Sequence, residues 1–331
     1  PLSAQVYHYT SCGRVCDQDV GKRSYYIVMS EQREVEGIIF DIDHFAVHDG
    51  EGIRTCVYLK GCPLHCRWCH SPESQEEEPE ILFAPGRCTG CGACVAQCPR
   101  GLQRIEEGVR IFDRAQCIKC GACVLVCAAG ALTLSGKRRG ISEVLEELVE
   151  DREFYRNSNG GVTISGGEVL SQPVFVTELL KGLKREGIHT IIETSGYGRK
   201  EDLLAMAEYT DLFFYDYKLG DKEEFETYIG GDAGLVYSNL EALRRITDRI
   251  VLRVPMIPGI TDTDRNIKML YDIAGKLRIG RIHFLPYNPS AGAKYQWCGR
   301  EYTLEGLQGD MERLEQLKAM APETVEVEIV E

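Results

Sequence analysis

The 331-residue sequence contains no apolar run long enough to span a bilayer, and no secretory signal pattern stands at its start. It also lacks an excess of positive charge, because 38 Lys and Arg face 51 Asp and Glu, a net charge of −13. Nucleic acids and anionic membranes bind basic protein surfaces. We therefore expect a cytoplasmic protein with neither nucleic acid nor membrane as a partner.

A disulfide framework is not expected either, although the chain contains 15 cysteines. Their number is odd and most of them stand in tight C-x2-C groups, which are typical of metal binding in a reducing compartment. Cys12 and Cys16 stand apart in residues 1–35, a segment without a clear hydrophobic period. We interpret this segment as an N-terminal extension with two free thiols, and Met29 within it as a candidate native start.

Apolar residues alternate between strand and helix periods over most of the remaining chain. Expected strands cover 55–60, 161–165, 189–194, 211–218, 249–255, 281–286 and 324–330. Expected helices cover 141–155, 174–187, 201–209, 264–277 and 304–320, and further helical stretches fill 221–247. Such alternation predicts an α/β fold with a parallel sheet. Six β/α units indicate a partial (β/α)6 barrel of the TIM type, since a closed barrel has eight units.

Residues 76–135 interrupt this alternation and are expected to form an insert between the barrel segments 36–75 and 136–331. The insert repeats the spacing C-x2-C-x2-C-x3-C of bacterial ferredoxins, in which the fourth cysteine of each run ligates the other cluster. It therefore predicts a ferredoxin-like domain with two 4Fe–4S clusters. Zinc is the alternative, but zinc sites seldom use eight cysteines in this repeat. The first cluster would be held by Cys88, Cys91, Cys94 and Cys127, and the second by Cys98, Cys117, Cys120 and Cys123.

Three further cysteines, Cys62, Cys66 and Cys69, stand in GCPLHCRWCH with the spacing C-x3-C-x2-C. None of the remaining cysteines has an obvious cluster context. The simplest interpretation is a third 4Fe–4S cluster with one iron left open. An open coordination position is typical of a catalytic metal rather than a structural one.

This spacing, with Trp68 directly before the third cysteine, resembles the radical S-adenosylmethionine signature. Five more segments narrow the resemblance: HDGEGIRT (48–55), SGGE (165–168), ETSGY (193–197), YDYK (215–218) and LPYN (285–288). Together with the insert they resemble the glycyl-radical-enzyme activating enzymes, the family of the pyruvate formate-lyase activating enzyme. The resemblance covers nearly the whole chain from residue 36.

The resemblance implies an anaerobic oxidoreductase in which the open iron binds S-adenosylmethionine. Reductive cleavage gives a 5′-deoxyadenosyl radical, which removes a hydrogen atom from a glycine of a partner glycyl radical enzyme. A flavodoxin or a ferredoxin is implied as the reductant. Members with such an insert serve diol dehydratases, choline lyase, arylacetate decarboxylases, hydroxyproline dehydratase and hydrocarbon–fumarate synthases, and the sequence does not choose among them.

The resemblance also implies roles for residues at the strand ends, where barrel active sites are built. Trp68, the glycines of SGGE and Lys218 would contact the cofactor, and Asp49 would meet the glycyl loop. A monovalent cation could bind beside the cofactor. The implied cofactor contacts are Trp68, Gly166, Gly167, Glu168, Glu193, Thr194, Asp216, Lys218, Arg253 and Asn288, of which Glu193, Thr194 and Asp216 could hold the cation.

Other interpretations remain open. The family usually has proline where Glu51 stands, and proline would restrict the turn after Asp49. A radical enzyme acting on a small molecule would share the three-cysteine loop, and an electron-transfer protein would explain the insert alone. The two insert clusters could relay electrons, or they could stabilise a docking module that lacks a core of its own.

Overall fold

The structure, a computed structural model, describes residues 34–330. The predicted extension, with Cys12, Cys16 and Met29, therefore lies almost entirely outside the described residues. No helix in the described part is both long and apolar enough to cross a membrane.

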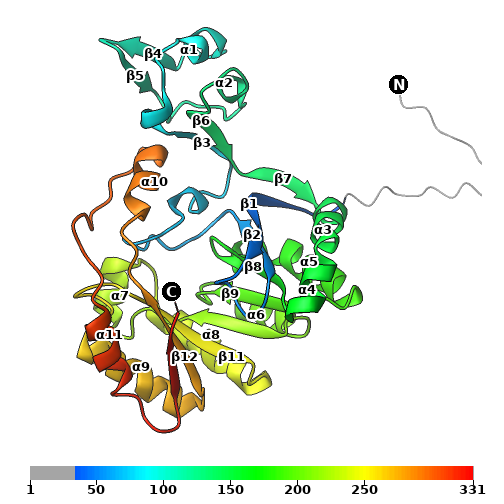
Figure 1. Ribbon diagram of the computed structural model, residues 1–331, viewed down its shortest axis with the longest axis vertical. Helices are drawn as coiled ribbons and strands as arrows, with labels where there is room; N and C mark the ends of the chain where they lie inside the picture. The colour runs from blue at the N-terminus through cyan, green and yellow to red at the C-terminus, as the bar shows by residue number, and fades with distance from the viewer. Residues whose placement is uncertain (1–33, 331) are drawn as a thin grey trace, which may run out of the picture. The chain divides into compact units, whose positions relative to one another are not determined.

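A nine-stranded sheet forms the centre of the fold (Figure 1). Seven neighbouring strands run parallel, and all six barrel strands expected from the sequence are among them. The parallel strands are β2 (Arg54–Leu59), β8 (Gly161–Gly166), β9 (Thr190–Thr194), β10 (Leu212–Asp216), β11 (Ile250–Met256), β12 (Arg281–Pro286) and β13 (Glu326–Ile329). Because β13 is one edge of the sheet and is not paired to the other edge, the sheet remains open.

Two antiparallel strands extend the other side of the sheet. β1 (Glu36–Ala46) pairs with β2, and β7 (Lys137–Gly140) pairs with the first residues of β1. The segment SEQREVEGIIF had suggested a strand near the start of β1, whereas β7 was not expected from the sequence. β7 directly precedes the first long helix, so the chain returns to the sheet as it leaves the insert.

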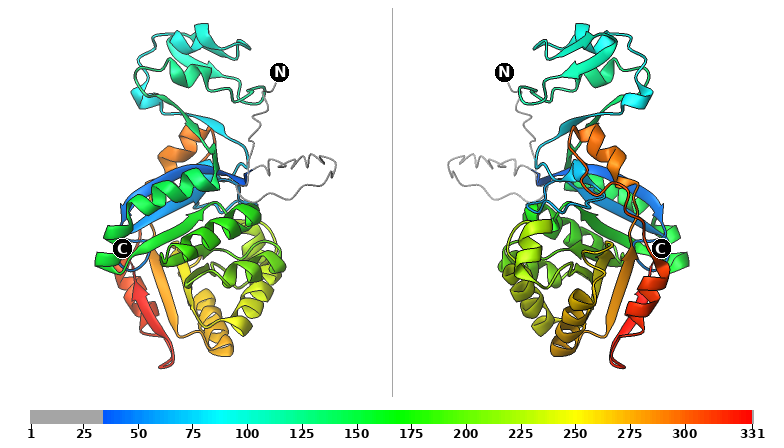
Figure 2. Two further views of the ribbon diagram at one scale, coloured as in Figure 1. Left: turned by 90° about the vertical axis from the view of Figure 1, so that its right-hand side faces the viewer. Right: turned by 90° about the vertical axis from the view of Figure 1, so that its left-hand side faces the viewer.

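Helices connect the parallel strands and lie along the outside of the sheet (Figures 1 and 2). They are α3 (Ile141–Glu150), α4 (Arg152–Ser158), η3 (Val169–Ser171), α5 (Pro173–Arg185), α6 (Lys200–Ala207), α7 (Lys222–Tyr228), α8 (Ala233–Ile246), α9 (Asp264–Leu277) and α11 (Met311–Lys318). A further helix after β12, α10 (Ala291–Cys298), lies beside the insert instead (Figure 1). Apolar faces of these helices and of the sheet form one main core. In this core Val57 of β2 and Leu179 of α5 are fully buried.

Two predicted helices have different bounds. The helix expected over 304–320 is limited to α11, because Gly306 has a left-handed φ of 83° and the side chain of Asp310 caps α11 at its start. The helix expected over 141–155 breaks at Asp151 into α3 and α4. Helix α10 was not expected, since its sequence AGAKYQWC is short and has little apolar period.

The insert, residues 76–135, forms two small sheets of its own. Its elements are β3 (Glu80–Phe83), η2 (Pro85–Arg87), α1 (Ala93–Gln97), β4 (Gln103–Glu106), β5 (Val109–Phe112), α2 (Ala122–Leu125) and β6 (Leu132–Ser135), and η1 (Pro72–Ser74) precedes them. β3 and β6 pair with each other where the chain enters and leaves the insert. The insert is therefore attached by a two-stranded stem.

Candidate active site

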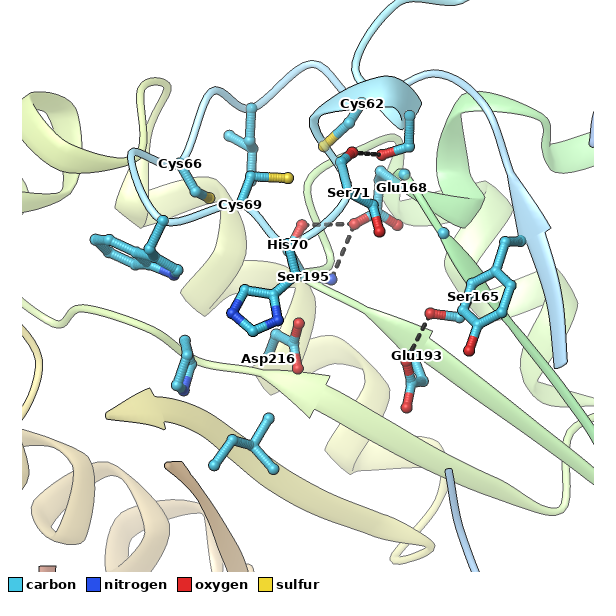
Figure 3. Close-up of a pocket in the computed structure, with 18 of the residues that line it drawn as sticks. Cys62, Cys66, Cys69, His70, Ser71, Ser165, Glu168, Glu193, Ser195 and Asp216 are labelled. Carbon is cyan, nitrogen blue, oxygen red and sulfur yellow. Dashed lines mark hydrogen bonds between the residues drawn. The ribbon is translucent and has the colours of Figure 1, made fainter. Parts of the chain in front are cut away.

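The parallel strands end at a cavity of about 570 Å³. Its lining includes the three-cysteine loop, Asp49 and every other implied cofactor residue except Asn288. Figure 3 shows the cysteine loop facing Glu168 and Ser195, with Glu193 and Asp216 at the neighbouring strand ends. Residues from segments far apart in the chain thus meet in one place.

Backbone hydrogen bonds to neighbouring segments hold the cysteine loop in place. The amide of His65 donates to the carbonyl of Ile229 at 2.8 Å, and the amide of Arg67 donates to Tyr228 at 2.9 Å. Trp68 is 3% exposed and packs in the main core while also lining the cavity. The loop is therefore shaped by the barrel around it.

The thiols of this loop lie in a poorly hydrated environment. Burial raises the pKa of Cys62, Cys66 and Cys69 to about 12. A metal ion stabilises the thiolate directly, so such thiols ionise readily only with a cation among them. No disulfide involves any cysteine of residues 34–330, and all three thiols are free to act as ligands.

The glycine pair of SGGE lets strand β8 approach the segment that leads into Cys62. A Cβ atom on Gly166, whose φ is 110°, would lie 2.3 Å from the amide nitrogen of Leu59. A Cβ atom on Gly167 would lie 2.3 Å from the carbonyl oxygen of Gly61. The amide of Glu168 donates to that same carbonyl oxygen at 2.8 Å. Only glycine permits this contact between the β8 turn and the cysteine loop.

Glu168 itself is 1% exposed, and both of its carboxylate oxygens accept hydrogen bonds. Thr194 Oγ1 donates to Oε1 at 2.5 Å, and the amide and hydroxyl of Ser195 donate to Oε2 at 2.9 and 2.5 Å. Burial raises the pKa of Glu168, and the hydrogen bonds from Ser195 and Thr194 oppose this shift. The carboxylate thus joins the ends of β8 and β9.

Glu193 and Arg253 form an ion pair across strands β9 and β11. Ser165 Oγ also donates to Glu193 Oε2 at 2.5 Å. Burial raises the pKa of Glu193; Arg253 opposes this shift, whereas the carboxylates of Asp49 and Asp216 add to it. Within the described part of the chain, the buried Nε of Arg253 has no hydrogen-bond partner. This guanidinium therefore retains one unused donor.

Lys218 lies between the strand ends and the cysteine loop. Its Nζ is 3.0 Å from Asp216 Oδ2. Burial acts to lower its pKa, but Asp216 and the thiols of Cys66 and Cys62 outweigh burial and raise it. The cavity therefore contains a buried ammonium group next to the cysteines.

The loop that carries Asp49 is held from within the sheet by Arg54, which is fully buried. Arg54 Nε donates to Thr163 Oγ1 at 2.7 Å, and Thr163 Oγ1 donates to the carbonyl of Asp49 at 2.8 Å. A Cβ atom on Gly50, whose φ is 127°, would collide with Ile191. This support fixes the position from which Asp49 lines the cavity.

Asn288 does not join the cavity. It is exposed, and its Oδ1 accepts a hydrogen bond from the amide of Ser290 at 3.0 Å. Several residues that do belong to the site were not singled out from the sequence: Arg54, Tyr58, His70, Ser165, Ser195 and Lys294. Ser165 and Ser195 lie inside the quoted segments SGGE and ETSGY, so the signal for them was present.

The insert groups its eight cysteines around two further cavities. One is lined by Cys88, Cys91, Cys94 and Cys127, and the other by Cys98, Cys117, Cys120 and Cys123. These are the two groups predicted from the sequence. Gly92 and Gly121, with φ of 75° and 73°, make the same left-handed turn before α1 and α2. Cluster binding in these groups stays a prediction.

No group of three or more His, Cys, Asp or Glu side chains within residues 34–330 is arranged to hold a single metal ion. In a four-iron cluster each thiolate binds a different iron, so its ligands stand farther apart than those of one ion. Arg253 and Lys218 neutralise the carboxylates of Glu193 and Asp216. The monovalent cation also stays a prediction.

Known proteins are similar to this chain over most of its length. A family model described as a 4Fe-4S single cluster domain matches residues 48–216. The choline trimethylamine-lyase activating enzyme of Oleidesulfovibrio alaskensis is 39% identical, covering 85% of this chain and 94% of its own. The (2S)-3-sulfopropanediol sulfolyase activating enzyme of Bilophila wadsworthia is 39% identical, covering 87% of this chain and 97% of its own.

A crystal structure of a domain of pyruvate-formate lyase-activating enzyme from Bacteroides vulgatus is 24% identical. It covers 51% of this chain and 98% of that domain, with a TM-score of 0.44. The two curated relatives align over nearly their whole length, so the similarity extends far beyond the cysteine motifs.

Proposed function

The chain belongs to the glycyl-radical-enzyme activating enzymes of the radical S-adenosylmethionine superfamily, and we propose that the cavity at the strand ends is its active site. When bound, a reduced 4Fe–4S cluster cleaves S-adenosylmethionine to methionine and a 5′-deoxyadenosyl radical, which takes a hydrogen atom from a glycine of the partner. The observation that carries this proposal is the single cavity shared by the C-x3-C-x2-C loop, the SGGE turn and Asp49.

Cys62, Cys66 and Cys69 would hold the catalytic cluster, and one iron would remain open for S-adenosylmethionine. The fit is supported by three free, partly buried thiols on one loop that backbone hydrogen bonds hold in place. The ammonium group of Lys218 would bind the methionine carboxylate, because it is the buried cation beside this loop. Arg253 Nε, the unpartnered donor, would bind an oxygen of the same ligand.

Glu168 would act mainly as a positioning residue. Its two carboxylate oxygens accept hydrogen bonds from Thr194, Ser195 and Leu170, and these hydrogen bonds hold the ends of β8 and β9 together. Backbone carbonyl groups of the Gly166–Gly167 turn would then contact the ammonium group of S-adenosylmethionine. Glu193, Thr194 and Asp216 would shape the neighbouring wall and could hold a monovalent cation.

Asp49 would meet the glycine loop of the partner. It lines the same cavity as the cysteine loop and is held by Thr163 and Arg54. This support would let Asp49 orient a peptide against the site of radical formation without moving itself. Fixing two reactants in this way is a large source of rate enhancement.

The insert would bind two more 4Fe–4S clusters, for three per chain, as a ferredoxin-like domain set into a partial (β/α)6 barrel. Two cysteine groups in the spacing of bacterial ferredoxins support this. The reductant would be a flavodoxin or a ferredoxin in the anaerobic cytoplasm. The partner would be a glycyl radical enzyme, as the names of the relatives indicate for theirs.

The test is to mix the reduced, reconstituted protein and S-adenosylmethionine with purified glycyl radical enzymes and record EPR spectra. The panel follows the relatives: choline trimethylamine-lyase, sulfopropanediol sulfolyase, isethionate sulfite-lyase, hydroxyproline dehydratase and benzylsuccinate synthase. We expect a glycyl radical doublet with one member and none with an Asp49→Ala variant.

Formation of 5′-deoxyadenosine without any doublet would contradict the partner assignment and favour a small-molecule substrate or a partner outside the panel. Absence of S-adenosylmethionine cleavage in protein with full iron content would overturn the active-site assignment itself. A protein that only transfers electrons would give this result, because it would contain iron without cleaving S-adenosylmethionine.

A further inference from the structure

We propose that α10 connects the insert to the catalytic cysteine loop, and that the reducing electron reaches the cavity from the insert across this helix. The proposal rests on the function proposed above and extends it by giving the insert the role of a relay. It also assigns an order to the two cysteine groups of the insert. Two residues in the C-terminal half of α10, Tyr295 and Trp297, make the contacts on which the proposal depends.

Tyr295 of α10 touches the three-cysteine loop. Tyr295 Oη donates to the carbonyl oxygen of Cys66 at 3.2 Å. The ring of Tyr295 packs on Tyr302 at 4.9 Å, and Cys69 lies against this small apolar cluster. α10 also contacts η1, the turn that follows the loop. The helix thus contacts the backbone of Cys66 and packs near Cys69.

Two residues further along α10, Trp297 touches the insert, and the helix also contacts β3. Arg114 donates through Nη2 to the carbonyl of Trp297 at 2.6 Å and through Nη1 to the carbonyl of Ile81 at 2.5 Å. Gly299 leaves the room for this side chain, since a Cβ atom there would lie 2.7 Å from Arg114 Nε. Arg114 stands three residues before Cys117 in the chain.

Ile81 also lines the cavity of the second cysteine group, Cys98, Cys117, Cys120 and Cys123. The second group is therefore the one next to α10. Figure 1 shows α10 below β3, on the side of the insert that faces the large sheet. Two cysteines of the first group, Cys88 and Cys91, are exposed, against one of the second, Cys120, so the first group offers the larger exposed face to an external donor.

Paired charges make this junction rigid. Lys60 at the end of β2 is 1% exposed, and its Nζ lies 3.3 Å from Glu80 Oε1 at the start of the stem. Arg300, just after α10, reaches the same carboxylate at 3.3 Å. Separating these groups would leave a buried charge without a partner, which is strongly unfavourable. The insert is consequently held at a constant position beside α10.

The proposed route transfers one electron from the external carrier to S-adenosylmethionine. A low-potential one-electron carrier, a flavodoxin or a ferredoxin, loses one electron at the first cysteine group. That electron passes through the second group and across Trp297 and Tyr295 to the catalytic loop, where S-adenosylmethionine accepts it as its C5′–S bond breaks. No proton has to move along α10.

The test uses the full chain with reconstituted iron and S-adenosylmethionine, and follows reduction of the catalytic cluster by rapid-freeze EPR. Reductants are photoreduced flavodoxin and photoreduced deazaflavin, a small molecule that can reach the cavity itself. In a Cys117→Ala/Cys120→Ala variant we expect flavodoxin to lose its ability to reduce the catalytic cluster. Deazaflavin should reduce that cluster as in the unmodified protein.

Arg114→Ala tests the junction, with Arg104→Ala as the matched control. Arg104 is an exposed arginine of the same insert whose side chain, among residues 34–330, pairs only with Glu106. We expect slower reduction by flavodoxin with Arg114→Ala and no change with Arg104→Ala, at equal iron content. Tyr295→Phe should show the same slowing if Arg114→Ala fails to hold its iron.

Equal flavodoxin rates in the cysteine variant and the unmodified protein would overturn the relay. Unchanged rates in both Arg114→Ala and Tyr295→Phe would overturn the route across α10. Neither result would contradict the proposed function, because that function is tested by S-adenosylmethionine cleavage with deazaflavin as the reductant. Loss of that cleavage in the unmodified protein would instead refute the proposed function.

Discussion

The catalytic cysteine loop and the insert both contain closely spaced cysteines, but they are supported in opposite ways. Around the loop, Leu64 and Trp68 are part of the main core of the protein. In the insert, the buried apolar cluster consists only of Ile81, Cys123 and Leu132. The three-cysteine loop is thus supported by the protein core, whereas we expect the insert to depend on bound metal, as small domains without a sufficient core do.

The pKa values of Cys66 in the loop and Cys98 in the insert are also shifted in opposite directions. Burial raises the pKa of Cys66 to about 12. At Cys98 of the insert, slight burial acts to raise the pKa, but backbone hydrogen bonds from Leu102, Arg100 and Gly101 lower it. A loop whose cysteines are all partly buried suits a site that must exclude water during radical chemistry. Three insert cysteines, Cys88, Cys91 and Cys120, are exposed, which suits exchange of electrons with another protein.

The largest expected effect comes from removing one cysteine in each region. Cys66→Ala should abolish S-adenosylmethionine cleavage with every reductant, because the catalytic cluster loses a ligand that nothing else replaces. Cys120→Ala should keep cleavage with a small chemical reductant. Iron analysis and chromatography of 5′-deoxyadenosine measure both, against about twelve irons per unmodified chain from three four-iron clusters. Retained cleavage in Cys66→Ala would refute the three-cysteine site.

Removal of iron should change the structure of the insert but not that of the barrel. After chelation without oxygen, we expect amide hydrogen exchange to become fast over residues 84–131, while β8 to β12 stay protected. The reason is that the insert has few buried apolar side chains of its own, and metal binding there is folding energy. Uniform loss of protection throughout the barrel would contradict the comparison.

Substitution of one glycine in each region should have a smaller effect, and it compares how tightly the two backbones are packed. Gly167→Ala should destabilise the barrel by about 2 kcal/mol, as overpacked sites do, because the new Cβ atom meets the carbonyl of Gly61. Gly86→Ala in the insert meets nothing within 4 Å and should be neutral or stabilising by about 0.5 kcal/mol. Chemical denaturation of both variants gives the two values, and equal effects would show that the barrel turn is not tightly packed.

The smallest expected effect is a pH dependence from Glu168, a carboxyl group buried beside the cysteine loop. Its pKa in the folded protein lies above 4.5, the ordinary value, mainly because of burial. Between these two pKa values the folded state binds a proton that the unfolded state has released. The free energy of unfolding should therefore decrease as pH rises through this interval.

Glu168→Gln cannot titrate, so denaturation midpoints measured across this range should vary less with pH in the variant. Glu193 has a pKa shifted in the same direction, and part of the slope will remain for that reason. An unchanged slope in Glu168→Gln would show that Glu168 has the same pKa folded and unfolded.

Much of the fold was predictable, because strands and helices of a parallel α/β sheet carry strong local patterns. Helix α9 and strand β12 have the bounds predicted from the sequence. The failures share a physical cause: each depends on contacts with distant residues. α10 is stabilised by contacts with the stem and with the cysteine loop rather than by its own pattern. β7 is a strand only because β1 lies beside it.

For the site, the sequence by itself determined the chemistry. Ligand spacing such as C-x3-C-x2-C is a property of a single turn, so it can be recognised without the rest of the fold. The spacing of the two insert runs likewise determined the predicted grouping of their cysteines, which the cavities reproduce.

Only the tertiary structure decided which side chains remain available in the cavity. Glu168 is occupied by Ser195 and Thr194, Arg253 retains a donor, and Asn288 lies outside. It also decided that α10 stands between the insert and the cysteine loop. These outcomes depend on the order of strands in the sheet and on packing between segments far apart in the chain, which no local spacing encodes.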